Sequence, residues 1–184
     1  MTSVMVMPRA EEWTVDDLAG LPDDGLQYEI FDGVLVVSPA PNPGHQRALQ
    51  ACYRLLHSGC PEQLEVFVAP LDFQPTPRRS LQPDVLVARR DAIGPKNLTA
   101  PPVLAVEILS TGTRSKDLVF KRAMYESSGV ESYWVIDPHE VAFTAYDLVD
   151  GVYRRTAAAS GGEIVRVERP YPVAVCAKDL VEGR

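Results

Sequence analysis

Apolar runs alternate with short segments rich in Gly, Pro and charged residues along the 184 residues of the chain. Runs of β-prone residues predict strands at 27–31, 34–37, 64–69, 71–74, 85–88, 103–110, 131–138, 141–148 and 152–156, with a weaker strand at 163–167 and a closing segment at 173–180. Apolar residues at helical spacing, together with capping residues and breakers, predict helices at 14–19, 45–57 and 115–128. We therefore expect an α/β (α+β) fold in which helices flank a central mixed β-sheet and β-hairpins are added to it.

The dipeptide Asp32-Gly33 separates the first two predicted strands. It is a strong signal for a β-hairpin, because both central positions of a type I′ turn need a positive φ angle. Side chains alternate between the two faces of a strand, so Glu29 shares a face with Phe31 and lies opposite to Ile30. The hairpin therefore carries an acid beside an apolar neighbour.

The run 103–110 contains one carboxylate, Glu107, within a continuous apolar sequence that follows Pro101-Pro102. Such a run predicts a strand that is buried on both faces. A charge in this setting is costly unless it is paired, protonated or bound to a cation. Solvation at a strand end or pairing with an arginine would also explain a single acid, so Glu107 needs partners before it indicates a function.

Asp84 stands at the start of the predicted strand 85–88. If this strand lies beside the strand that contains Glu107, the two carboxylates converge on one cleft. Mg²⁺ prefers octahedral oxygen coordination and often uses only one or two protein carboxylates. The two acids therefore predict a site for Mg²⁺ or Mn²⁺, where the metal would polarise a phosphodiester and activate a water molecule.

Lys121 lies on the predicted helix 115–128, between the directions of Leu118 and Tyr125. It can lean toward the core, where it would orient the attacking water or stabilise negative charge on the phosphate. The alternative is a surface lysine that forms an i,i+4 pair with Asp117. Tyr125 itself is interpreted as a core residue.

His45 and the cysteines are weaker candidates. His45 lies where a loop enters the helix 45–57, so it could cap the helix, face solvent or reach the site; we assign it to substrate binding. A cysteine hydrolase that uses Cys52 or Cys60 with a histidine is a further hypothesis. Cys52 falls on the core stripe of its helix and Cys60 beside a Gly and a Pro, so neither has the setting of an activated thiol.

The composition of the chain indicates which partners and which location to expect. The chain has 18 basic and 25 acidic residues, a net charge of -7 and a pI of about 5.0, so no overall attraction to nucleic acid or to an anionic membrane is expected. Three cysteines without metal-ligand spacing favour a reducing, cytoplasmic location, and no apolar run is long enough to span a membrane. The length predicts a single domain over 1–184 with a flexible N-terminus at 1–12.

One further segment is expected at the surface. The segment 75–80 contains two prolines and two arginines and is interpreted as an exposed loop. Its pair Arg78-Arg79 is interpreted as part of the solvated surface.

Several segments in order along the chain carry a resemblance to a known family. They are Tyr28-Glu29-Ile30-Phe31-Asp32-Gly33, Gln82-Pro83-Asp84-Val85, Val106-Glu107-Ile108-Leu109-Ser110, Asp117 with Lys121 and Tyr125, and Gly129-Val130-Glu131-Ser132-Tyr133-Trp134-Val135-Ile136-Asp137-Pro138. Together they resemble the Uma-two type family of nucleases, within the restriction-endonuclease-like PD-(D/E)XK superfamily. The resemblance implies a restriction-endonuclease-like core.

This resemblance also implies roles for individual residues. Asp84 and Glu107 would be metal ligands, and Glu29 would be a further acid of the metal site. The superfamily's lysine normally stands two residues after the second acid, where this chain has Leu109. Lys121 would have to replace it from the following helix.

Two functions follow as hypotheses. The first is a Mg²⁺- or Mn²⁺-dependent nuclease that hydrolyses DNA phosphodiester bonds with Asp84, Glu107 and Lys121 as catalytic residues. The second is a non-catalytic module that keeps the nuclease fold for binding DNA or protein. The missing lysine and the negative net charge motivate the second hypothesis, and a homodimer is expected.

Overall fold

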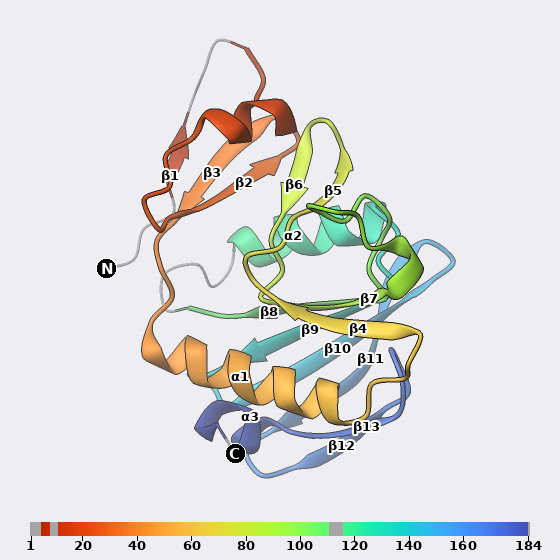
Figure 1. Ribbon diagram of the computed structural model, residues 1–184. Helices are drawn as coiled ribbons and strands as arrows, with labels where there is room; N and C mark the ends of the chain where they lie inside the picture. The colour runs from red at the N-terminus through yellow and green to blue at the C-terminus, as the bar shows by residue number, and fades with distance from the viewer. Residues whose placement is uncertain (1–4, 8–10, 111–115, 184) are drawn as a thin grey trace.

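The central feature of the fold is a six-stranded mixed sheet with helices on both faces (Figure 1). The computed structural model describes residues 5–7, 11–110 and 116–183. The strand order is β11-β10-β9-β8-β7-β4, and within the described residues only β8 and β9 are parallel neighbours. The strands are β4 (Leu64–Val68), β7 (Val85–Arg89), β8 (Leu104–Ile108), β9 (Ser132–Asp137), β10 (Ala142–Val149) and β11 (Val152–Ser160). The expected α+β class with a mixed central sheet is confirmed.

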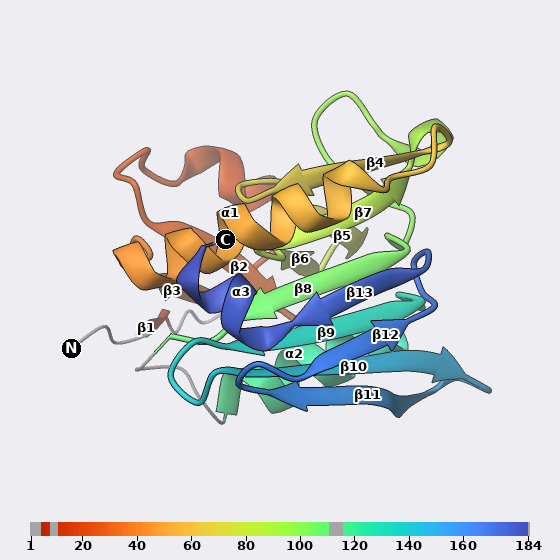
Figure 2. The same ribbon diagram turned by 90° about the horizontal axis from the view of Figure 1, so that it is seen from below.

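Helices cover the two faces of this sheet unequally. The helix α2 (Lys116–Ser127) connects the parallel strands β8 and β9 and lies on one face. The opposite face carries α1 (Pro43–Ser58), α3 (Ala177–Glu182) and the two-stranded sheet of β12 (Ile164–Val167) and β13 (Val173–Cys176). Seen from below, α1, α3 and this small sheet lie in front of the central sheet and α2 lies behind it (Figure 2).

The alternation of side chains divides the core between the two faces. In β7, Val85 and Val87 pack in the cluster that includes α1, whereas Leu86 packs in the cluster of α2. In the same way Val106 of β8 belongs to the α1 side and Ala105 to the α2 side. Every residue of β8 is buried, as the apolar run predicts. Period-two alternation therefore places Glu107 on the face that α2 covers.

A second sheet, next to α2, has the order β1-β3-β2-β6-β5. Its strands are β1 (Met5–Met7), β2 (Gln27–Phe31), β3 (Val34–Ser38), β5 (Phe73–Thr76) and β6 (Arg79–Leu81), and the short 3₁₀ helix η1 (Val15–Gly20) packs against it. The predicted turn is present, with φ angles of 49° at Asp32 and 90° at Gly33. Of the segment 1–12, residues 1–4 and 8–10 lie outside the described residues.

Residues 76–78 are exposed as expected, but two other expectations about the segment 75–80 are wrong. Instead of an exposed loop, the chain forms the antiparallel pair β5–β6, with Thr76 opposite Arg79. Pro75 is tolerated because β5 is the edge strand and the register shifts between Phe73 and Thr76. The Arg79 side chain is only 13% exposed, so it does not belong to the solvated surface.

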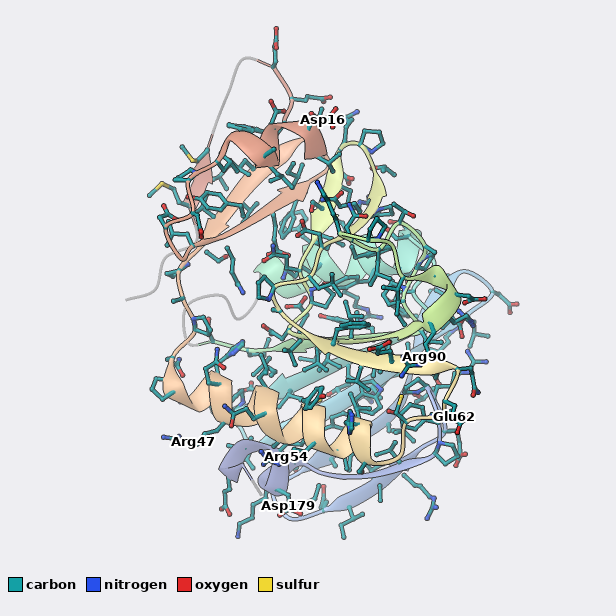
Figure 3. All side chains as sticks on the ribbon, viewed as in Figure 1. Asp16, Arg47, Arg54, Glu62, Arg90 and Asp179 are labelled. Carbon is teal, nitrogen blue, oxygen red and sulfur yellow. The ribbon has the colours of Figure 1, made fainter. Side chains whose placement is uncertain are left out.

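The helix α1 begins at Pro43, two residues before the predicted start. The Asn42 side chain accepts a hydrogen bond from the backbone N–H of His45 at 3.0 Å and so caps the helix, and Pro43 occupies the first turn. Further along α1, the Arg54 guanidinium donates to the carbonyl of Gly183 at 2.7 Å, just beyond α3. Figure 3 labels Arg54 beside Asp179 of α3. The predicted cap at Ser115 lies outside the described residues.

Arg79 joins the hairpin to the helix α2. Its guanidinium forms a bidentate pair with Asp32 at 2.8 and 2.9 Å. It also donates to the Met124 carbonyl at 3.2 Å and to the hydroxyls of Ser127 and Ser128 at 2.9 and 2.8 Å. One largely covered cation therefore binds the β2–β3 turn and the C-terminal end of α2 together, where it also complements the helix dipole.

Replacing Arg79 with alanine is expected to reduce the free energy of unfolding by about 2–3 kcal/mol, because several charge-assisted hydrogen bonds disappear from a nearly buried position. Urea unfolding measures this loss. Arg78→Ala is the matched control, since the Arg78 side chain is 51% exposed and pairs with an exposed Glu12; its cost should be about 0–1 kcal/mol. Equal losses in the two variants would show that Arg79 does not anchor the second sheet.

Candidate active site

Three carboxylates, a lysine and a histidine meet in a cavity at one end of the central sheet. They are Glu29 of β2, Asp84 before β7, Glu107 of β8, Lys121 of α2 and His45 of α1, and each is buried, with 4–8% of its surface exposed. Charged residues are seldom buried without partners. Residues from five different parts of the chain therefore share one desolvated site.

Lys121 lies between two of the carboxylates. Its ammonium nitrogen is 3.0 Å from Oε1 of Glu29 and 3.1 Å from both carboxylate oxygens of Glu107. The side chain thus leans into the site, as expected from its place between the directions of Leu118 and Tyr125. The alternative pairing with Asp117 falls on a side chain outside the described residues.

Asp84 is held at the level of Glu107 by the register of the sheet. Val85 lies opposite Val106 in the antiparallel pair of β7 and β8. Asp84, which precedes Val85, therefore lies next to Glu107, which follows Val106. The Oδ2 atom of Asp84 accepts a hydrogen bond from the Ile108 backbone N–H at 2.7 Å. The expectation that the two acidic strands are neighbours is confirmed.

His45 reaches the same carboxylate from the first turn of α1. Its Nε2 atom lies 3.1 Å from Oδ2 of Asp84. Burial lowers the pKa of the His45 imidazole, but the hydrogen bond and the charge of Asp84 outweigh burial and raise the pKa above its ordinary value. Of the possibilities left open for this residue, the structure therefore supports a place in the site.

Two groups that the sequence analysis did not assign to the site also contact its carboxylates. The hydroxyl of Tyr125 donates to Oε1 of Glu107 at 2.7 Å, and the backbone N–H of Gln82 donates to Oε1 of Glu29 at 2.8 Å. Tyr125 is completely buried, so its interpretation as a core residue holds, but its hydroxyl faces the site. The spacing of four residues from Lys121 was the available signal, because residues i and i+4 share one face of a helix.

The site has more acids than bases, and this imbalance shifts its pKa values. Burial raises the pKa of Glu107 to about 7; the charges of Asp84 and Glu29 raise it too, while Lys121 and the Tyr125 hydroxyl lower it in part. Burial likewise raises the pKa of Glu29. Burial alone would lower the pKa of Lys121, but the surrounding carboxylates raise it above its ordinary value.

The charge surplus bears on whether a divalent cation fits here. Burial and the neighbouring carboxylates make Glu107 take up a proton more readily than an exposed glutamate, although the Lys121 ammonium contacts two of the three acids. A hard cation would supply the missing positive charge, and carboxylate oxygens are the donors that Mg²⁺ prefers. In the described parts of the chain, no three His, Cys, Asp or Glu side chains are grouped closely enough to hold a metal. The oxygen donors therefore suit such a cation in kind, but among the described residues they do not form a group of three ligands.

The cysteine hypothesis gains nothing from the structure. Cys52 is completely buried in the α1 core stripe, and burial raises the pKa of its thiol well above the ordinary value. A thiol that resists deprotonation is a poor nucleophile. The Cys60 thiol lies 3.7 Å from the carbonyl of Pro61.

Three buried carboxylates and a lysine thus lie together in an α+β fold with a mixed central sheet. The family model Uma2, described as "Putative restriction endonuclease", matches residues 15–177, and the chain belongs to this family. The family resemblance drawn from the sequence is thereby confirmed.

Other comparisons agree on the fold. A crystal structure described as a putative nuclease belonging to DUF820, from Anabaena variabilis ATCC 29413, is similar with a TM-score of 0.72 and 20% identity. The match covers 92% of this chain and 98% of that chain. A search of curated proteins found no match. Among the helices of the described residues, none combines the length and the apolar character needed to cross a bilayer.

Removing the ammonium of Lys121 should expose the cost of the buried carboxylates. Lys121→Met is expected to lower the free energy of unfolding by about 3–5 kcal/mol at pH 8, because the carboxylates lose their counter-charge. The loss should shrink at pH 5, since carboxyl groups with raised pKa values are protonated below those values and stabilise the folded state there. Urea unfolding at both pH values measures the difference.

Lys178→Met provides the control, because Lys178 is half-exposed and its pair with Glu182 is 3.9 Å apart. Its effect should be about 0–1 kcal/mol at either pH. A loss in Lys121→Met that does not change with pH would contradict the electrostatic explanation.

Proposed function

We propose that the protein is a metal-dependent nuclease that hydrolyses phosphodiester bonds of DNA. The observation that supports this most directly is the contact of Lys121 with Glu107 at 3.1 Å, beside Asp84, in a cavity with a surplus of negative charge. Membership of a family described as a restriction endonuclease agrees with it.

Asp84 and Glu107 are the residues that would hold Mg²⁺ or Mn²⁺. When bound, such a metal polarises the phosphodiester and lowers the pKa of a water molecule, which supplies the nucleophile. His45 and the Ile108 N–H hold the Asp84 carboxylate in position. The Tyr125 hydroxyl orients Glu107 and favours its charged form.

Lys121 would stabilise the negative charge that builds up on the phosphate, because its ammonium is fixed in a site with little water. Glu29 positions this ammonium at 3.0 Å and is itself fixed by the Gln82 N–H. Glu29 thus serves the site through Lys121, and its contact with the metal would require the ammonium to move. Leu109 stands at the usual lysine position, and α2 supplies the cation instead.

The non-catalytic alternative has one observation in its favour. Lys121 already contacts both oxygens of Glu107, which would have to turn partly toward a metal. DNA binding that is equal with EDTA and with Mn²⁺, without cleavage, would establish this alternative. The homodimer and the cytoplasmic location stay predictions, and the free thiols of Cys52, Cys60 and Cys176 agree with a reducing compartment.

Cleavage of plasmid and oligonucleotide DNA should require Mg²⁺ or Mn²⁺ and stop with EDTA. Asp84→Asn and Glu107→Gln are each expected to lower the rate by about 10²–10³-fold, because each removes a charge from the reacting centre. Glu131→Gln is the control, since Glu131 is exposed and pairs with Arg89 at the surface. Full activity in Asp84→Asn would rule out the proposed roles.

The pKa of Glu107 predicts how metal binding depends on pH. Mn²⁺ must displace the proton of Glu107, whose pKa is about 7, so affinity should fall about tenfold for each pH unit below that value and level off above it. Calorimetry from pH 5.5 to 8.5 measures the profile. Tyr125→Phe removes a hydrogen bond that lowers this pKa, so the midpoint should move to higher pH. A flat profile would contradict Glu107 as a ligand.

A further inference from the structure

Two cavities of very different size adjoin at Asp84. The first, which contains Glu107 and Lys121, has a volume of about 90 Å³, and the second has a volume of about 490 Å³. The first cavity is therefore much the smaller of the two. The residues that line both cavities are Gln27, Pro41, His45, Gln82 and Asp84.

The second cavity, here called the side cavity, lies between η1, the start of α1 and the turn at Ala69-Pro70. Its volume falls in the range of small-molecule sites, roughly 300–1,000 Å³. Much of its wall is apolar, with Leu18, Leu26, Leu49, Val68 and Pro70. Leu26 and Val68 are exposed at its rim, so this open cavity can cover the apolar face of a bulky group that is joined to whatever enters the smaller cavity.

The charges of the side cavity exclude a second phosphate as its occupant. Among the described residues that line it, none is a lysine or an arginine, whereas Asp23 and Asp72 are acids. A phosphate would be repelled and would find no bidentate cation. A neutral group with an apolar face and a polar edge matches this wall.

Gln82, a residue that lines both cavities, has a polar atom without a partner. The Nε2 of Gln82 donates to Oδ1 of Asp72 at 2.8 Å, and because a carboxylate only accepts, the other end of the amide must present its oxygen. This oxygen, Oε1, is buried and has no hydrogen-bond partner among the described residues. A buried unsatisfied acceptor costs about 1–3 kcal/mol, so a ligand N–H that reaches Oε1 after the amide turns toward the cavity would recover this energy.

His45 adds a second unpartnered atom. Its side chain is 8% exposed and its Nε2 faces Asp84, while Nδ1 is buried without a hydrogen-bond partner in the described part of the chain. Both residues that carry an unpartnered atom line both cavities. The polar edge of the expected occupant therefore lies close to the reacting centre.

We propose that the side cavity binds the base of the nucleotide beside the phosphate that is cleaved, with an exocyclic amine or ring N–H donating to Oε1 of Gln82. This inference rests on the proposed nuclease function and specifies its substrate. A base can enter such a cavity only when it is unpaired and unstacked, which costs little in a single strand and several kcal/mol in a duplex. The protein is therefore specific for single-stranded or unpaired DNA.

Binding in EDTA tests the side cavity without any cleavage. A fluorescent single-stranded 12-nucleotide DNA is compared by anisotropy with a fully abasic strand of the same length. The natural strand should bind about tenfold more tightly, because one buried base is worth about 1–3 kcal/mol. Gln82→Leu, which removes the acceptor, and Leu26→Trp, which fills the cavity from its rim, should abolish the difference between the strands.

Val152→Trp is the control for adding a large side chain, since Val152 is exposed in the β10–β11 hairpin. It should keep the wild-type preference for the natural strand. Equal binding of the natural and the abasic strand by the wild-type protein would overturn the proposal. So would a preference that both cavity variants retain.

Cleavage provides the second measurement. With Mn²⁺, the single strand should be cut about tenfold faster than the same sequence in a duplex, and the two cavity variants should bring this ratio close to one. Equal rates on the two substrates in the wild type would overturn the side cavity as a base site while leaving the nuclease function intact. Binding that depends on the base, without cleavage of any DNA, would support the side cavity as a base site and would contradict the nuclease function.

Discussion

The contact of the Lys121 ammonium with Glu107 and Glu29 is the interaction on which the site depends. Each of these charges would be costly in the core alone, because burial removes the water that solvates it. Together they are tolerated, and they connect the central sheet, the second sheet and α2 through one point. The local architecture therefore has to bring three separate elements to within hydrogen-bond distance.

Two structural features keep these elements in place. The antiparallel register of β7 and β8 brings Asp84 to Glu107, and Arg79 holds the hairpin of β2 and β3 against the end of α2. The hairpin carries Glu29 on the face that turns toward α2, while Ile30 packs with η1 on the other face. Side-chain alternation on a single strand thus gives one residue to a core and its neighbour to the site.

The charges of the site differ from those of the rest of the molecule. Outside the site, arginines join segments of the fold by binding acids and carbonyl groups. Arg54 binds the carbonyl of Gly183 at the end of α3, and Arg90 binds Glu62 and Glu65 (Figure 3). In the cavity, acids outnumber the single lysine, and burial holds the pKa of Glu107 near 7. The negative potential at the site would attract a cation and would weaken the binding of duplex DNA.

The sequence by itself determined the class of fold, the hairpin at Asp32-Gly33, the buried strand around Glu107 and the family, because these follow from periodicity, turn chemistry and motif order. It also selected Asp84, Glu107, Lys121 and Glu29, but it left the position of His45 open and took Tyr125 as core alone. It predicted a loop at 75–80 because prolines and charges suggested exposure, whereas an edge strand tolerates Pro75 and the contacts of Arg79 with Asp32 and the end of α2 leave its side chain only 13% exposed.

Only the tertiary structure decided that Lys121 contacts Glu107, that the Tyr125 hydroxyl and the Gln82 N–H contact the acids, and that a larger cavity adjoins the site. The physical reason is that these contacts join residues far apart in the chain. Their distances depend on strand register and on the packing of α2 and the second sheet, and no local pattern records either.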